Sequence, residues 1–417
     1  MGKLDTIFAV LLILAGLFRG VFAQDFDITS IGYAEFIQLA QESDPVYSRL
    51  QNEALELKSN GAAAHSFPDP VVTIGLDDVA TEFGVTEETK TVIGIQQTLP
   101  SFGMRRADGG SMLAEARAKE SEARNRLLEV ERGATDAWLE LYYAFAAQQL
   151  IVANRRIFEE MLRITQARYR AGRGTQGEVI AAQLEISKIE NRVTEFEMTK
   201  DMASAQLGNW LGAAIARWEV TPEFPVLGAV PKYESIRESI GEHPSVVAAD
   251  AMVDAGRSVL DLAKSRYWPE TMVSLTYSKR DIDESAMVAA MLSFSVPLFP
   301  PRRQDRWVNA GRARVDGAKD EAKGRLRELH VMLEEQYRRW RRLNELLQRF
   351  EKDLLPYASQ YSQATLNSYQ SAIVEFDTLV EARVQELDTK LEALRLQVDR
   401  AKAQAALIYL AGRQSNE

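Results

Sequence analysis

The chain has 417 residues, enough for two or three ordinary domains, and its composition of 46% hydrophobic and 26% charged residues is typical of a folded protein. Its formal net charge of −10 argues against a nucleic-acid partner, because binding to phosphates requires clustered cations. The sequence contains no cysteine, which excludes disulfides, thiolate metal sites, cysteine nucleophiles and the acylated cysteine of a bacterial lipoprotein.

The N-terminus is typical of an export signal. Lys3 supplies a positive charge, residues 7–18 form an apolar run, and Val21–Ala23 is a plausible cleavage site before Gln24. The alternative is an anchor helix, but the apolar run is short and Arg19 interrupts it. We therefore expect a signal peptide at 1–23. The later sequence contains no stretch of 18 apolar residues, so we expect no transmembrane helix in the mature chain.

The remaining chain repeats itself after about two hundred residues. Matched segments begin, in the same order, at Tyr33 and Tyr233, at Asp69 and Trp268, at Leu99 and Val296, and at Tyr169 and Tyr369. A constant offset over several landmarks predicts that both halves build the same structural unit. We expect a first repeat at 24–211, a proline-containing linker at 212–241, and a second repeat with a C-terminal tail at 242–417.

Each repeat contains a helix followed by two alternating segments. The first helix is expected from Asp44 to Phe67, ended by Pro68 and Pro70. Apolar and polar residues then alternate over 71–77 and 91–99, and again over 273–277 and 288–296. This period of two predicts strands with one apolar and one polar face. Four such strands are too few to close a barrel.

Two very long proline-free runs follow the strand pairs. They cover 107–169 and 304–355, and apolar residues in the second run recur at steps of three, four or seven, which is typical of a coiled-coil-like seam. A helix of ~63 residues is about 95 Å long at 1.5 Å per residue. One compact domain cannot enclose such a rod, so we expect it to pack beside copies of itself.

Together these features resemble the TolC family, the trimeric outer-membrane exit ducts of efflux pumps and type I secretion systems. The motifs that carry the resemblance are the duplicated units ending in "LPSFGMRR" and "VPLFPPRR" and the turns that begin at Tyr169 and Tyr369. The segment "GIQQTLPSFGMRR" is similar to that of heavy-metal efflux members. The resemblance implies a mostly α fold with a small β part, in which a homotrimer forms a 12-stranded β-barrel and a 12-helix α-barrel. It also implies a periplasmic adaptor, an inner-membrane pump and outer-membrane lipid as partners.

The two helix–helix turns are the predicted functional tip. Gly172, Gly174 and Gly177 spell G-x-G-x-x-G, but a helix precedes them where a dinucleotide fold needs a strand, so Gly172 is interpreted as a helix C-cap. The candidate gate consists of Glu178, Glu375, Asp377 and Glu381, which threefold symmetry would arrange as rings of carboxylates. The alternative is that they are solvated helix starts. The candidate adaptor contacts are Gly172, Thr175, Gln176, Ser371 and Ala372.

The remaining charged motifs have simpler interpretations. Arg105, Arg106, Arg302 and Arg303 lie where strand passes into helix, and we expect them at the periplasmic edge of the barrel, near lipid phosphate. His65, His243 and His330 lack metal-ligand spacing, and no catalytic constellation is visible, so neither an enzyme nor a cofactor is expected. The predicted function is a passive outer-membrane channel subunit. A periplasmic coiled-coil adaptor is the main alternative, and the cargo stays open among metal ions, drugs and peptides.

Overall fold

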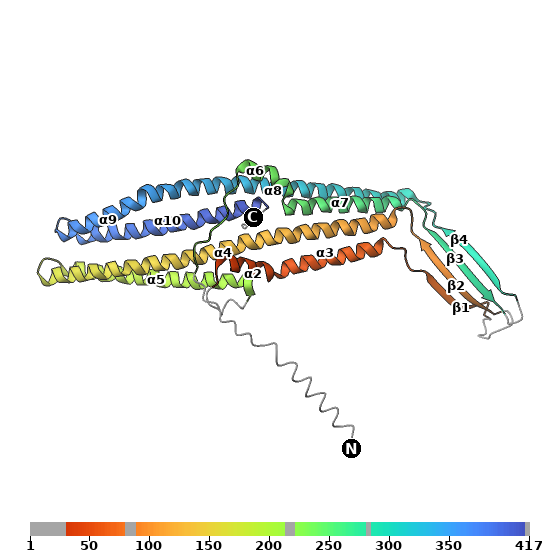
Figure 1. Ribbon diagram of the computed structural model, residues 1–417, viewed down its shortest axis with the longest axis horizontal. Coiled ribbons are helices and arrows are strands. Elements are labelled where there is room, and N and C mark those ends of the chain that lie inside the picture. The colour runs from red at the N-terminus through yellow and green to blue at the C-terminus, as the bar shows by residue number, and fades with distance from the viewer. Residues whose placement is uncertain (1–30, 80–88, 213–221, 281–284, 413–417) are drawn as a thin grey trace, which may run out of the picture.

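The computed structural model describes residues 31–79, 89–212, 222–280 and 285–412 and shows an elongated molecule (Figure 1). A small sheet occupies one end, two helical hairpins reach the other end, and α2 and α6 lie beside the helices near the middle. The predicted signal peptide, 1–23, lies outside the described residues.

The elements of the two halves follow the same order, and the second half has additional 3-10 and π-helical segments. The first half contains α2 (Tyr33–Glu42), α3 (Pro45–Ala64), β1 (Val71–Asp77), β2 (Lys90–Leu99), α4 (Met104–Arg170) and α5 (Gln176–Leu211). The second contains α6 (Tyr233–Ser239), the short 3-10 turn η2 (Ile240–Glu242), α7 (Pro244–Ser265), β3 (Thr271–Lys279), β4 (Met287–Phe294), the 3-10 turn η3 (Pro300–Arg302), α8 (Gln304–Arg349), η4 (Phe350–Leu354), α9 (Leu355–Gln370) and α10 (Phe376–Leu410). The mostly α fold with internal duplication is thus confirmed. The division into repeats and linker stays a prediction, and α6 lies within the predicted linker, 212–241.

The long helix of the second half continues past its predicted end at Leu355. Pro356 has no N–H group, so it cannot complete the ordinary helical hydrogen bond to the preceding turn. The chain accommodates this defect with a π-helical segment, η4, in which the N–H of Leu355 bonds the carbonyl of Phe350. The rod therefore runs from Gln304 to Gln370, matching α4 in length.

The helices are packed along apolar seams of the kind that the sequence predicted. Leu329, Leu333, Leu347 and Phe350 are buried on the rod of the second half, and Leu379, Leu387 and Val398 are buried on α10. The Trp138 ring of α4 is 1% exposed and packs against Phe36 of α2 in a separate cluster. Each cluster is local, so the core is a series of layers along the rods.

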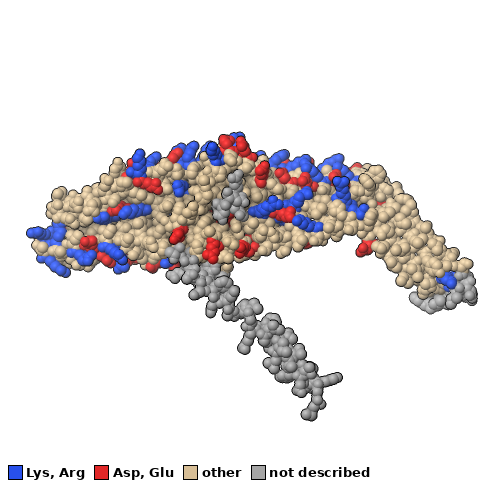
Figure 2. Space-filling model, in the orientation of Figure 1, with Lys and Arg blue, Asp and Glu red and all other residues tan. Residues whose placement is uncertain are grey.

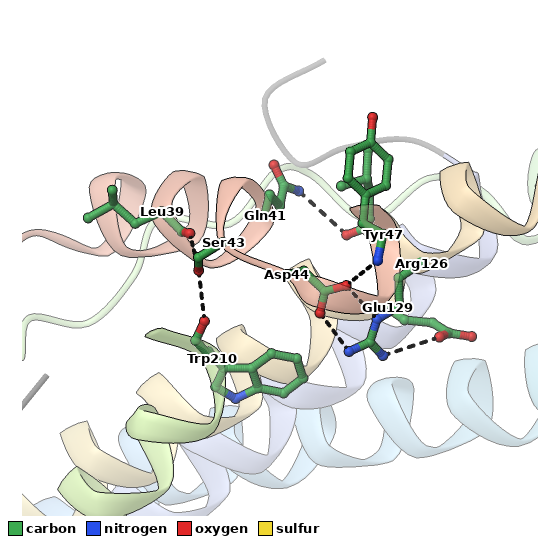
Figure 3. Close-up of polar contacts among 9 residues, drawn as sticks. Leu39, Gln41, Ser43, Asp44, Tyr47, Arg126, Glu129 and Trp210 are labelled. Atoms are coloured by element: carbon green, nitrogen blue, oxygen red, sulfur yellow. Dashed lines mark hydrogen bonds and ion pairs between the residues drawn. The ribbon is translucent and has the colours of Figure 1, made fainter. Parts of the chain in front are cut away.

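A cluster of polar contacts around Asp44 fixes the start of α3 onto α4 (Figure 3). Asp44 caps α3 by accepting a bond from the N–H of Tyr47 at 2.7 Å, and Arg126 donates two bonds to the same carboxylate at 3.2 and 2.8 Å. Burial raises the pKa of Asp44, but the bonds from Arg126 and Tyr47 outweigh it, so this pKa lies below its usual value. The Ser43 hydroxyl also donates to the carbonyl of Trp210 at 3.1 Å, which connects α5 to the residue immediately before Asp44.

The four strands form one antiparallel sheet in the order β1-β2-β3-β4. The register places apolar side chains in one row across all four strands, exemplified by Ile74, Ile93, Tyr277 and Val288. On β2 and β3 these residues are more exposed than the neighbours that point to the opposite face. Figure 2 shows charged side chains along the helices and very few over the sheet.

The sheet is open in the described part of the chain. β1 and β4 each pair with one strand only, so each leaves one edge of N–H and C=O groups without a strand partner. Along the described segments, no helix is both long and apolar enough to cross a membrane.

The two faces of β3 provide a test of the resemblance, which implies that the apolar face of the sheet contacts outer-membrane lipid. Leu275 belongs to the apolar row and is 50% exposed, whereas its neighbour Ser274 points to the opposite face. We expect Leu275→Arg to destabilise the membrane-inserted protein by about 2–4 kcal/mol if this residue lies near the bilayer midplane. The measurement is the fraction of folded protein recovered from outer membranes, and Ser274→Arg is the matched control. Equal losses in the two variants would contradict the assignment of the faces.

Candidate gate at the helical tip

The two hairpins end in turns of the same geometry. In the first, the N–H of Arg173 bonds the carbonyl of Arg168 at 2.8 Å, and the N–H of Gly172 bonds the carbonyl of Tyr169 at 3.0 Å. In the second, Ile373 bonds Ser368 at 2.9 Å and Ala372 bonds Tyr369 at 3.0 Å. Both are Schellman motifs, in which the first residue after the helix cap adopts the left-handed conformation.

The residue in that left-handed position differs between the hairpins. Gly172 has a φ of 69°, so the interpretation of Gly172 as a C-terminal helix signal agrees with the backbone. Ala372 occupies the same position with a φ of 57°, and its Cβ makes this conformation costly by roughly 1–2 kcal/mol. The second turn therefore stores strain that the first does not.

A polar link joins the two hairpins of one protomer behind these turns. The Tyr369 hydroxyl, at the end of α9, donates to a Glu178 carboxylate oxygen at 3.1 Å, at the start of α5. Arg168 of α4 donates to the Tyr369 carbonyl at 2.6 Å, and its guanidinium lies 4.4 Å from the centre of the Tyr369 ring. Phe376 of α10 packs edge-on against the same ring at 5.7 Å. All four hairpin helices thus meet at Tyr369, which is 2% exposed.

The surroundings of Tyr369 keep its hydroxyl protonated. Burial raises the pKa of Tyr369 to about 12, and the nearby negative charge of Glu178 acts in the same direction. The stabilisation from this neutral hydroxyl is present below the ordinary tyrosine pKa of about 10 and is lost as the pH rises towards 12.

The predicted gate residues fall into two groups. Glu178 is partly buried and bonded to Tyr369, and its N–H is capped by the Thr175 hydroxyl at 3.2 Å. Glu375, Asp377 and Glu381 are exposed, and the described residues provide them with no ion pair or hydrogen bond. One protomer therefore does not bring the four carboxylates together, and their role as a gate stays a prediction.

The predicted adaptor contacts lie at the extreme end of the hairpins. Gly172, Thr175, Gln176, Ser371 and Ala372 are all exposed there. Next to them, the Ile373 side chain is 76% exposed, an apolar residue that the sequence reasoning did not single out. Their role as adaptor contacts likewise stays a prediction.

Arg168 was not predicted from the sequence, and Tyr369 was predicted only as a landmark of the repeat. Tyr169 and Tyr369 are equivalent in the duplication, yet Tyr169 is 48% exposed while Tyr369 is buried. The sequence contains no signal for this difference, because it depends on how the two hairpins lie side by side.

The histidines and the arginine-rich stretch of α8 lie elsewhere. His243 bonds the Tyr409 carbonyl at 3.1 Å, His330 bonds the Leu326 carbonyl at 2.8 Å, and His65 packs beside Gly109. Over the described ranges, no group of three or more His, Asp or Glu residues is placed to hold a metal ion. Arg342 pairs with Glu345 at 2.7 Å, and Arg338 pairs with Glu334, as expected of a solvated helix face.

Comparison with known proteins identifies the class. The chain matches the family described as outer membrane efflux protein over residues 53–213 and 235–413, which is most of its length, and it belongs to this family. It is therefore an outer-membrane protein with a periplasmic helical part, and the alternative of a periplasmic adaptor is not favoured.

Particular relatives agree with this family. The fusaric acid resistance protein FusA of Burkholderia cepacia is 26% identical over 185 residues, which is 42% of this chain and 34% of that protein. The chain thus spans about a third of the length of that relative.

Solved structures share the fold at low identity. CusC matches with a TM-score of 0.80 and 13% identity, covering 93% of each chain. VceC of Vibrio cholerae matches with a TM-score of 0.78 and 17% identity, covering 91% of this chain and 96% of VceC. The MtrE channel of Neisseria gonorrhoeae, solved in its open state, has a TM-score of 0.73 and 14% identity, covering 91% and 88%.

The link at Tyr369 predicts a specific weakening of the tip. Tyr369→Phe removes the hydroxyl and retains the ring. We expect the free energy of separating the two hairpins to fall by about 1 kcal/mol, the contribution of one partly exposed hydrogen bond, so that they separate more often. Spin labels at cysteines replacing Gly177 and Ser371 would report a broader distance distribution, without background from native cysteines. Raising the pH from 10 to 12 should broaden the distribution of the parent protein in the same way. Tyr169→Phe is the control, and equal broadening there would contradict the link.

The strained turn predicts opposite effects of two substitutions. Ala372→Gly relieves the left-handed strain, so exchange of the Ile373 amide should slow, whereas Gly172→Ala introduces strain and should speed exchange of the Arg173 amide. The expected change is about fivefold, corresponding to roughly 1 kcal/mol in each turn. Hydrogen exchange resolved to single amides measures both. Slower exchange in Gly172→Ala would show that the turn does not require the left-handed conformation.

Proposed function

We propose that the chain is one subunit of a homotrimeric exit duct. In this assembly three four-stranded sheets close into a 12-stranded barrel in the outer membrane, and the helices continue as a hollow cylinder into the periplasm. The observation that supports it is the sheet with an exposed apolar row and, within the described residues, two edges without strand partners. A spanning sheet must satisfy its backbone groups by closing, since lipid offers no hydrogen-bonding partners.

Closure by three copies suits the lateral order of the elements. β1 and β4 are the outer strands of the sheet, and α3 and α8 are the outer helices that continue from them, because α4 packs between α3 and α7 and α7 packs against α8. A neighbouring protomer can therefore pair at both layers without rearranging the inner elements. Twelve strands lie within the range of about 8 to 26 known for outer-membrane barrels.

The duct would act without chemistry of its own. An inner-membrane pump would supply the energy, and a periplasmic adaptor would contact the exposed hairpin ends at Gly172, Thr175, Gln176, Ser371 and Ala372. The exposed Ile373 side chain supports such a contact, because burying it against a partner removes an apolar surface from water.

Opening would require the hairpins of each protomer to move apart at the tip. The link from Arg168 and Glu178 to Tyr369 would hold them together in the resting state, and adaptor binding would have to outweigh it. The exposed carboxylates of Glu375, Asp377 and Glu381 would form rings in the trimer and favour cations at the narrow end.

The cargo would be solutes delivered by the pump. The name of FusA points to resistance against fusaric acid, while "GIQQTLPSFGMRR" favours the heavy-metal branch of the family. Loss of the gene in its host should therefore raise sensitivity to the substrates of one pump class. Testing metal salts and organic acids in parallel would distinguish the two branches.

A trimer test addresses the assembly. An outer-membrane extract in mild detergent should give a high-mass band that collapses to a monomer only after heating. A protein that is monomeric and soluble without detergent would instead support the adaptor alternative.

A conductance test addresses the gate. Replacing Glu375, Asp377 and Glu381 with alanine should increase single-channel conductance in planar bilayers and lower cation preference, because the ring charges and their contacts are removed. The matched control is alanine at Asp316, Asp320 and Glu328, three exposed carboxylates on α8. Unchanged conductance and unchanged cation preference in the tip variant would remove these residues from the gate.

A further inference from the structure

A wide groove lies where the sheet passes into the helices. It has a volume of about 1040 Å³ and lies between the ends of α3 and α7 and the start of α4. This volume is at the upper end of the range for small-molecule pockets, roughly 300–1,000 Å³. The tip, the gate and the predicted adaptor contacts lie at the other end of the molecule (Figure 1).

One wall of the groove is aromatic and strongly exposed. Phe67 is 55% exposed, Phe102 is 86% exposed and Trp268 is 63% exposed. Aromatic side chains gather at membrane–water interfaces, where their rings lie at the level of the lipid headgroups. Leu99, which continues the apolar row of β2, also lines the groove. The groove therefore adjoins the surface that faces the acyl chains.

Positive charge lies directly beside these rings. The Arg105 guanidinium donates to the His65 carbonyl at 2.9 Å and lies 3.5 Å from the centre of the Phe67 ring, so it is held in place. Arg106 lies beside it and is exposed. Among the described residues no carboxylate pairs with either guanidinium. Asp261 also lines the groove, but Lys264 pairs with it at 2.9 Å and compensates its charge.

The groove also holds hydrogen-bond donors that point to an anion. No side chain caps the first turn of α4. Backbone N–H groups at the positive end of the helix dipole are therefore available to an anion. Ser101, immediately before this helix, is only 6% exposed, and its hydroxyl has no hydrogen-bond partner. A buried hydroxyl without a partner is uncommon, and Ser101 is the lining residue of the groove that has one.

The equivalent junction of the second half differs. There the Arg303 guanidinium lies 4.9 Å from the centre of the Trp307 ring, and Arg266 lies 4.4 Å from the same ring. A 3-10 turn, Pro300–Arg302, replaces the open approach to the helix. The groove thus contains the arginine pair of the first half and not that of the second, although α7 of the second half also lines it.

We propose that this groove binds the phosphate headgroup of a membrane phospholipid from the periplasmic leaflet. Arg105, Arg106 and the Ser101 hydroxyl hold the phosphate, and the acyl chains lie against Leu99 and the apolar row. Most of the lining comes from around the start of α4 and the end of α7, the inner helices of the protomer, and only His65 and Phe67 follow the outer helix α3. Closure of the trimer through β1, β4, α3 and α8 therefore leaves the side formed by α4 and α7 open. The proposal rests on this proposed trimer for the orientation of the apolar face.

Native mass spectrometry of the detergent-purified protein tests the proposal. The probes are phosphatidylglycerol, diacylglycerol and inorganic phosphate, each added at the same concentration. We expect up to one phosphatidylglycerol per protomer, no retained diacylglycerol, and no displacement of the lipid by inorganic phosphate. Arg105→Gln with Arg106→Gln should lower lipid occupancy at least fivefold. Arg155→Gln with Arg156→Gln, an exposed pair on the same helix, is the matched control and should leave occupancy unchanged.

The outcomes separate the lipid from its alternatives. Equal retention of diacylglycerol, or equal occupancy in the two double variants, overturns the phosphate site. Displacement by inorganic phosphate at equal concentration shows a site for free anions and overturns the lipid assignment. If the Arg105 and Arg106 variant does not fold, a photoreactive phosphatidylglycerol is crosslinked to the unmodified protein instead. We then expect labelling at Phe102 and Trp268. Labelling elsewhere overturns the proposal, whereas a monomeric unmodified protein contradicts the proposed trimer instead.

Discussion

The structure depends on a sheet that one chain cannot complete. Its apolar row, including Ile74, Ile93, Leu275 and Val288, is exposed, and in the part of the chain that the structure describes β1 and β4 each lack a strand on one side. If a single chain were in water, its apolar row would stay exposed to solvent. If a single chain were in lipid, the N–H and C=O groups of its sheet edges would have no hydrogen-bond partners. Both costs are removed together only when copies of the chain close the sheet within a membrane. The long helices are part of the same assembly, since α4 follows β2 and α8 follows β4 of the sheet that closes.

Duplication supplies the framework, and differences between the halves supply the functional features. α4 and the rod from Gln304 to Gln370 match in length, ~100 Å at 1.5 Å per residue, yet only the second contains a π-helical segment before a proline. At the tip, Gly172 is matched by the strained Ala372, and the exposed Tyr169 by the buried Tyr369. Where the sheet passes into the helices, the groove proposed to bind lipid contains the arginine pair of the first half and not that of the second. Equivalent sequence positions thus differ at both ends of the molecule, where the proposed duct meets its partners.

Much of the fold could be predicted because its signals are local. Alternation over 71–77 and 91–99, the proline-free rods and the Gly172 cap depend on neighbours in sequence, and the structure agrees with each of them. The helix beyond Pro356 was missed because π-helical accommodation has no simple sequence signal. The link from Arg168 and Glu178 to Tyr369 was missed for a different reason. It joins residues about two hundred positions apart, and only the side-by-side packing of the hairpins brings them together.

The most direct test of the account is whether neighbouring chains pair through β1 and β4. The chain has no cysteine, so cysteines replacing Thr73 and Ala289 would be the only thiols. These residues lie at one level of the sheet but on its outer strands, about 14 Å apart within one chain at ~4.8 Å per strand spacing. Because closing a tilted barrel staggers neighbouring sheets along the strands, the two cysteines are also moved along β1 and β4. A bismaleimide too short to join the two cysteines of one chain should give a covalent trimer from at least one double variant in outer membranes, and only monomers from each single variant. Monomers from every double variant, together with a monodisperse monomer in detergent-free buffer, would contradict the account.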